Sequence, residues 1–127
     1  MSKRILIIGQ ESKRKQLLLE RIKIEGYEFF SETEAEKAIN YLYYYREFID
    51  LIIFTTKSNT YSALNMCRKI RKLTEVPVIV VTARDEEYDE QYGENMKNVE
   101  FVSAHISPDI LFALINALLK PDSSLKP

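Results

Sequence analysis

The residues Val76-Pro77-Val78-Ile79-Val80-Val81-Thr82 place four consecutive apolar side chains after a proline. A strand with one face in water alternates apolar and polar residues, whereas a strand covered on both faces does not. The run 78–81 therefore predicts a strand buried on both faces of its sheet. The same pattern recurs in Ile5-Leu6-Ile7-Ile8 and Leu51-Ile52-Ile53-Phe54, and further strands are expected at 27–31 and 99–103.

Longer amphipathic segments separate these apolar runs and predict helices over 12–24, 33–46, 61–73, 86–96 and 108–120. Strand and helix thus alternate five times along the chain. Continuously apolar strands joined by helices indicate an α/β fold with a doubly wound, five-stranded parallel sheet and helices on both faces. We expect one domain over residues 1–120 and a linker or flexible tail over 121–127, where proline and serine are frequent.

Signals at the helix ends support these assignments. Ser12 can cap the first helix, and Gly26 can stop it. The stretch Thr33-Glu34-Ala35-Glu36 suggests a capping box for the second helix, and Pro108 suits the first position of the last. Helical spacing predicts that the buried stripe of the first helix is Leu17, Leu18 and Ile22.

Composition excludes several classes of protein. The 127 residues are 46% hydrophobic and 29% charged, and their net charge of −1 does not favour non-specific nucleic-acid binding. The lone Cys67 excludes an internal disulfide and a multi-cysteine zinc site, and its helical spacing predicts a core position. The apolar runs are too short for a membrane span or a signal peptide, so we expect a cytoplasmic protein without membrane contact.

In a parallel sheet of this kind the loops at the carboxyl ends of the strands form the functional crevice, which here comprises residues 9–11, 55–60, 82–85 and 104–106. Over residues 3 to 120 the chain resembles the CheY-like receiver domains of two-component response regulators. The resemblance is carried by Lys3-Arg4-Ile5-Leu6-Ile7-Ile8, by Asp50 to Thr55 with Cys67 to Arg71, by Val76 to Asp85, and by Ser107-Pro108-Asp109 with Leu111. It implies the flavodoxin/CheY-like (βα)5 fold.

The resemblance also implies a chemistry. Such receivers bind Mg²⁺ through an acidic pair after the first strand, accept a phosphoryl group on an aspartate that ends the third, and use a lysine after the fifth. The matching positions are uncharged: Gly9 and Gln10 at the acidic pair, Thr55 at the acceptor and Ala104 at the lysine. We therefore expect neither metal, cofactor nor catalysis. The Thr55 hydroxyl is expected to bond to nearby backbone.

Two family positions keep their chemistry. Thr82 matches the switch hydroxyl, and Phe101 stands for the switch tyrosine. This pair could still form a two-state switch, or it could be a core pair fixed in one state.

Four further residues are candidate crevice contacts. Lys57 and Arg84, together with Gln10, could bind a small anion, or Lys57 could be a solvated lysine that neutralises Glu11. Glu11 offers only one carboxylate for a metal. His105 lies beside the crevice without a second metal-ligating residue near it in sequence.

The last helix is apolar on nearly every side. Leu111, Ile115 and Leu118 have the spacing of a core stripe, which leaves Ile110, Phe112 and Leu114 as a candidate homodimer surface. The aromatic run from Tyr41 to Phe48 must also expose some rings, which could contact a protein partner. The polar segment 86–96 predicts a short, frayed helix.

Together these features predict a phosphorylation-independent receiver that acts as a regulatory and dimerisation module. The resemblance implies a DNA-binding transcription regulator, with DNA contacted only by a domain after Pro127. Two alternatives remain open: a stand-alone protein-interaction module, and a sensor that binds a small anion or metabolite in the crevice.

Overall fold

The computed structural model describes residues 2–56, 60–82 and 96–119. It contains one parallel sheet in the order β2-β1-β3-β4-β5, which confirms the predicted α/β class. The strands are β1 (Arg4–Ile8), β2 (Glu28–Glu32), β3 (Leu51–Thr56), β4 (Val78–Thr82) and β5 (Val99–Ser103).

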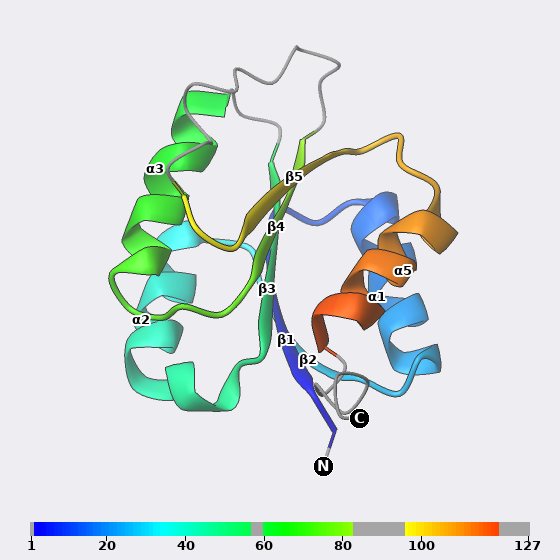
Figure 1. Ribbon diagram of the computed structural model, residues 1–127, viewed down its shortest axis with the longest axis horizontal. Coiled ribbons are helices and arrows are strands. Elements are labelled where there is room, and N and C mark those ends of the chain that lie inside the picture. The colour runs from blue at the N-terminus through cyan, green and yellow to red at the C-terminus, as the bar shows by residue number, and fades with distance from the viewer. Residues whose placement is uncertain (1, 57–59, 83–95, 120–127) are drawn as a thin grey trace, which may run out of the picture.

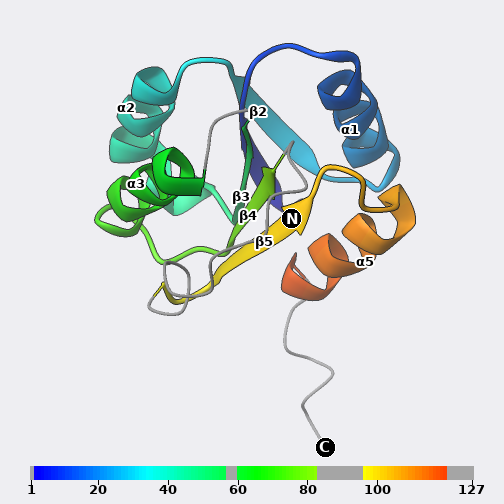
Figure 2. The same cartoon turned by 90° about the horizontal axis from the view of Figure 1, so that it is seen from above.

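Helices cover both faces of the sheet, as predicted (Figures 1 and 2). On one face lie α1 (Lys13–Ile24) and α5 (Pro108–Leu119); on the other lie α2 (Ala35–Tyr45), the short 3-10 helix η1 (Arg46–Phe48) and α3 (Thr60–Arg71). Lys57, Arg84, the tail 121–127 and all but the last residue of the helix predicted over 86–96 lie outside the described residues. No helix in the described ranges has the length and apolar character needed to span a bilayer.

Two apolar clusters, one on each face of the sheet, explain why the central strands are apolar throughout. Ile5 and Ile7 pack toward α1 and α5, whereas Leu6 and Ile8 pack toward α2 and α3. β3 and β4 alternate in the same way. Complete burial of each such side chain contributes about 1.5–3 kcal/mol relative to exposure.

Helix α1 begins as predicted but buries a different stripe. The Ser12 hydroxyl accepts a hydrogen bond from the Lys15 backbone N–H at 3.0 Å, and Gly26 adopts a left-handed φ of 89° just after the helix. Leu17, however, is 56% exposed, and Lys15 is buried in its place. The buried positions are Lys15, Leu18 and Ile22, which share one side of the helix.

The capping box predicted for α2 is wrong. The helix starts at Ala35, and no described side chain caps its first turn. The residue at the N-cap is Glu34 and not Thr33, and its carboxylate pairs with the Lys37 ammonium at 2.9 Å.

The structure corrects the prediction that Phe112 is a surface residue. Its ring is 2% exposed and lies 4.9 Å from the guanidinium carbon of Arg21, against α1. The buried stripe of α5 is Leu111, Phe112, Ile115 and Leu119, and Leu118 is only half-buried. Of the predicted surface residues, Ile110 is 61% exposed and Leu114 is half-buried.

Two other sequence predictions are confirmed. Cys67 is fully buried in the core beneath α3. The aromatic run at the end of α2 exposes several rings, among them Tyr43, Tyr44, Tyr45 and Phe48. The Tyr41 ring stacks on Phe30 of β2, with 4.1 Å between centroids.

Candidate functional site

The crevice forms where β1, β3 and β5 end. Gly9 directly follows β1, Thr55 lies near the end of β3, and Ala104 directly follows β5. Together with Gln10 these residues line one cavity of about 820 Å³. The structure therefore brings together all four positions that the resemblance assigns to phosphoryl transfer.

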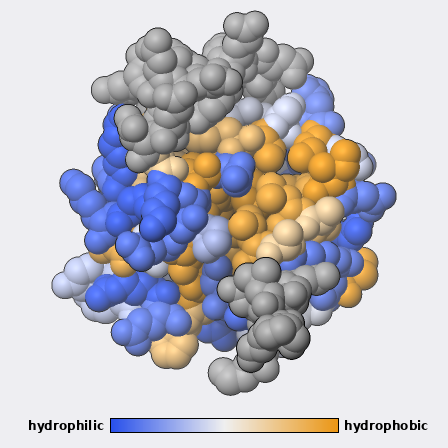
Figure 3. Space-filling view, viewed as in Figure 1, coloured by the Kyte–Doolittle hydropathy of each residue, from blue (hydrophilic) through white to orange (hydrophobic). Residues whose placement is uncertain are grey.

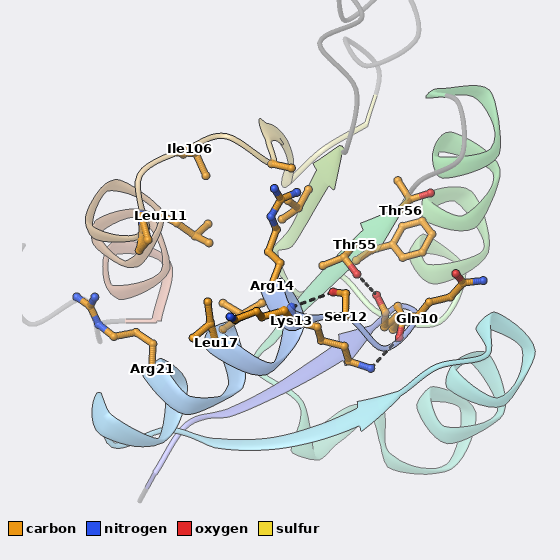
Figure 4. Close-up of a pocket in the computed structure, with 18 of the residues that line it drawn as sticks. Gln10, Ser12, Lys13, Arg14, Leu17, Arg21, Thr55, Thr56, Ile106 and Leu111 are labelled. Carbon is orange, nitrogen blue, oxygen red and sulfur yellow. Dashed lines mark hydrogen bonds between the residues drawn. The ribbon is translucent and has the colours of Figure 1, made fainter.

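Thr55 lies tightly against the end of β1. Its hydroxyl donates a hydrogen bond to the Ile8 carbonyl oxygen at 3.4 Å, as expected from the sequence (Figure 4). A Cβ atom at position 9 would overlap Thr55 Oγ1 and would lie 2.9 Å from the Thr55 carbonyl oxygen. This close approach requires glycine at position 9, so an aspartate there is incompatible with the present position of Thr55.

A buried lysine holds the loop between β1 and α1. The Lys15 side chain is 1% exposed, and its ammonium donates to the Gly9 carbonyl oxygen at 2.7 Å and to Glu11 Oε1 at 2.9 Å. A buried ammonium requires such partners because it loses its hydration. Glu11 is therefore paired with Lys15, a partner that sequence reasoning missed.

These residues do not fit the Mg²⁺ ion that the resemblance implies. Magnesium in proteins is usually bound through one or two carboxylates, but Gly9 has no side chain, Gln10 is neutral, and the Glu11 carboxylate already binds an ammonium. The described part of the chain contains no group of three His, Cys, Asp or Glu side chains placed to hold a metal.

One of the two switch positions bonds to β5, and the other packs into the core. The Thr82 hydroxyl donates to the Val102 carbonyl oxygen at 3.3 Å, across the pair formed by β4 and β5. Phe101 is half-buried and packs against the cluster beneath α2 and α3. Neither residue lines the cavity as described.

The remaining crevice candidates divide into two groups. His105 is exposed, its backbone N–H donates to Ser103 Oγ at 3.0 Å, and the described cavity lining includes its neighbours Ala104 and Ile106 but not His105 itself. Lys57 and Arg84 lie outside the described residues, so the anion site they were predicted to form remains a prediction.

The cavity extends beyond the crevice in a direction that the sequence did not indicate. It continues along α1 to α5, past Arg14 and Leu17 on one side and Ile106 and Leu111 on the other (Figure 4). Leu17, which looked like a core residue in the sequence, is an exposed part of this lining.

No protein-family model matches the chain. Among solved structures, a response regulator receiver domain from Clostridium thermocellum superimposes with a TM-score of 0.80 at 21% identity, covering 98% of this chain and 99% of that one. A two-component response regulator from Clostridium difficile gives 0.79 at 22% identity, with 96% and 99% covered. The N-terminal domain of a lantibiotic response regulator, the nisin resistance regulator, gives 0.75 at 20% identity, with 94% and 100% covered. The chain therefore has the fold of the CheY-like response regulator receiver domains.

Proposed function

We propose that this domain is a receiver-like regulatory module that works without phosphoryl transfer. The fold supports the regulatory part of the proposal, since the chain and the receiver domains it resembles cover each other almost completely. The observation that carries the second part is the chemistry at the acceptor position of the crevice. The hydroxyl of Thr55 lies against Gly9 and bonds to Ile8, in the place where a receiver needs an accessible carboxylate.

A threonine hydroxyl can also be a nucleophile, but only when an adjacent base accepts its proton. The Thr55 hydroxyl instead points to a backbone carbonyl oxygen, which is not a useful base at neutral pH. The carboxylate of Glu11, in the loop after β1, is paired with Lys15. The geometry therefore supports a structural role for Thr55.

The experiment is treatment of the purified domain with acetyl phosphate and Mg²⁺, followed by intact mass measurement. We expect an unchanged mass for the natural sequence. We also expect it for Thr55→Asp, because restoring the acceptor alone restores neither the acidic pair at 9 and 10 nor the lysine at 104. A phosphoryl adduct on the natural sequence would refute the proposal, and its loss in Thr55→Val would assign the adduct to Thr55.

We further propose that the domain associates with a second copy through β5 and α5. Strand β5 is at the edge of the sheet, and apolar side chains gather on the face that it forms with α5 (Figure 3). On α5, Ile110 is largely exposed, and Leu114 and Leu118 are half-buried. An apolar surface of this kind on a receiver-like fold favours self-association, because burying it removes apolar area from water.

The proposed output is control of a DNA-binding domain located after Pro127. It is supported by the full-length match to a domain that is the N-terminal part of a larger response regulator. The coding sequence downstream of Pro127 tests it: an encoded DNA-binding domain supports transcriptional control, whereas a stop codon favours the stand-alone interaction module.

A further inference from the structure

The cavity along α1 has the size of a small-molecule site. Its volume of about 820 Å³ lies within the range of roughly 300–1,000 Å³ typical of ligand pockets. It runs from the crevice at Gly9 and Thr55 to the loop before α5 at Ile106 (Figure 4).

The charge in this cavity has one sign. The ionisable residues among its described lining are Lys13, Arg14, Lys15 and Arg21, all of them basic. This is a local excess in a chain whose net charge is −1. Such a concentration of positive charge in a concave site attracts anions.

Two of these cations are already paired, and two are available. Lys15 binds Glu11, and Arg21 binds Glu25 and Asp109. Within the described part of the chain, neither the Lys13 ammonium nor the Arg14 guanidinium has a hydrogen-bond or ion-pair partner. The Arg14 guanidinium extends from α1 into the space between Thr55 and Ile106 (Figure 4). A guanidinium in such a position can bind a carboxylate or phosphate through two parallel hydrogen bonds.

The rest of the cavity lining is mostly apolar. Leu17 and Leu18 contribute from α1, and the opposite wall includes Val81, Ile106 and Leu111. Inorganic phosphate would leave this apolar wall in contact with water, whereas a ligand with a hydrocarbon or aromatic body would cover it.

We propose that this cavity binds a small organic anion with an apolar body, whose carboxylate or phosphate group is held by Arg14. This inference rests on the proposed function, because it requires that the crevice is not used for phosphoryl transfer. It assigns a regulatory input to a domain that cannot receive one through an acceptor aspartate.

The test is an NMR chemical-shift titration of the ¹⁵N-labelled domain with four probes. 1-Naphthylacetate and 1-naphthyl phosphate carry both features, 1-naphthylethanol lacks the charge, and inorganic phosphate lacks the apolar body. We expect the two naphthyl anions to shift the amide signals of Gly9, Gln10 and Leu17. The anion that binds more tightly shows whether the site prefers a carboxylate or a phosphate group. We expect each control probe to bind at least about tenfold more weakly.

Matched variants localise the interaction. Arg14→Gln should raise the dissociation constant of the naphthyl anions by about tenfold, which corresponds to the loss of about 1.4 kcal/mol. Arg68→Gln removes the same charge from an exposed site on α3, across the sheet, and should leave the dissociation constant unchanged.

Several outcomes would overturn the inference: equal binding of 1-naphthylethanol, equal binding of inorganic phosphate, no effect of Arg14→Gln, or shifts confined to α2. Failure here is distinguishable from failure of the proposed function. A domain that binds no naphthyl anion and gains no mass with acetyl phosphate refutes this inference alone, whereas a phosphoryl adduct refutes the proposed function.

Discussion

Lys15 links the first helix to the loop that ends β1. Its ammonium is fully buried and spans the Gly9 carbonyl oxygen and the Glu11 carboxylate. The Lys15 ammonium thus binds the same loop that carries the acidic pair in receivers that use Mg²⁺. Lys15 and Thr55 therefore both fix the end of β1, Lys15 through the Gly9 carbonyl oxygen and Thr55 through the Ile8 carbonyl oxygen.

Replacing the ammonium tests this role. We expect Lys15→Met to lower the free energy of unfolding by about 1–3 kcal/mol, because the buried Gly9 carbonyl oxygen loses its hydrogen-bond donor while the apolar stem is retained. Lys13→Met, an exposed lysine two residues earlier, is the control and should change stability by less than about 0.5 kcal/mol. Urea unfolding measures both. A Lys15→Met variant as stable as the parent would contradict the assigned role.

The close approach of Gly9 and Thr55 predicts a coupled pair. Gly9→Ala should destabilise the fold by about 1–3 kcal/mol because the new methyl group overlaps the Thr55 side chain. Thr55→Ala removes Oγ1, so the double variant should recover part of that loss. A double-mutant cycle measured by urea unfolding gives the interaction energy, and strictly additive effects would contradict the contact.

Cys67 predicts a pH effect and a reactivity. Burial raises the pKa of its thiol to about 11, an effect that the Arg71 and Arg68 charges only partly oppose. The folded state therefore keeps the proton while an unfolded thiol, with a pKa of about 8.5, loses it. Since the unfolded state binds fewer protons in this window, Cys67 makes stability fall as pH rises from about 8.5 toward 11.

We therefore expect the folded domain to resist alkylation by iodoacetamide at pH 8 and to react when unfolded in urea. Mass spectrometry over time measures the difference. The matched Cys67→Ala variant should lose the fall in stability between pH 8.5 and 11 that the thiol causes. Rapid labelling of the native domain would contradict the buried position.

At the level of secondary-structure elements, Arg71 fastens the end of α3 to two neighbouring segments. Its guanidinium donates to the carbonyl oxygens of Thr74 at 2.7 Å, Val76 at 2.5 Å, Lys97 at 3.0 Å and Asn98 at 3.1 Å. Partial burial lowers the pKa of this guanidinium but leaves it charged at neutral pH. One side chain thus ties the loop before β4 to the turn before β5.

This arrangement depends on the shape of the guanidinium as well as its charge. Lysine carries the same charge but cannot reach carbonyl oxygens on both sides at once, so Arg71→Lys should destabilise the fold by about 1.5–3 kcal/mol. Arg68→Lys, an exposed position on the same helix, should change little. Thermal and urea unfolding of the two variants provide the comparison, and equal stabilities would contradict the bridging role.

The strands could be predicted from sequence because β1, β3 and β4 bury both faces, so that each contains four consecutive apolar residues. Helix faces were harder to predict. In the sequence, Lys15 looks like a solvent-exposed residue. Its burial depends on the Gly9 carbonyl oxygen in the loop after β1, and helical periodicity does not reveal that partner. In α5 nearly every residue is apolar, so periodicity could not show that Phe112 faces the core.

The candidate site likewise has one part that could be predicted from the sequence and one part that could not. The missing charges at Gly9, Gln10, Thr55 and Ala104 could be predicted because each stands at a position defined by its neighbouring strand. The cavity beside Arg14 could not, because it depends on the separation of α1 and α5, which are more than 80 residues apart in sequence.

At the scale of the whole molecule, two apolar surfaces lie on opposite sides of the sheet. One is the aromatic surface at the end of α2, where Tyr44 is 74% exposed. The other is the β5–α5 face, which combines the edge strand β5 with the exposed Ile110 and half-buried Leu114 of α5. The second is the better interface for a symmetric dimer, because an open strand edge and an apolar helix side by side present one continuous surface.

Charge substitution on each surface decides between them. We expect Leu114→Glu to shift the dimer toward monomer, because a carboxylate buried at the interface without a partner is costly, and we expect Tyr44→Glu to leave association unchanged. Sedimentation equilibrium at several concentrations measures the mass, and thermal unfolding confirms that both variants fold. Dissociation by Tyr44→Glu alone would place the interface on α2, and a parent that stays monomeric at every concentration would refute self-association through either surface.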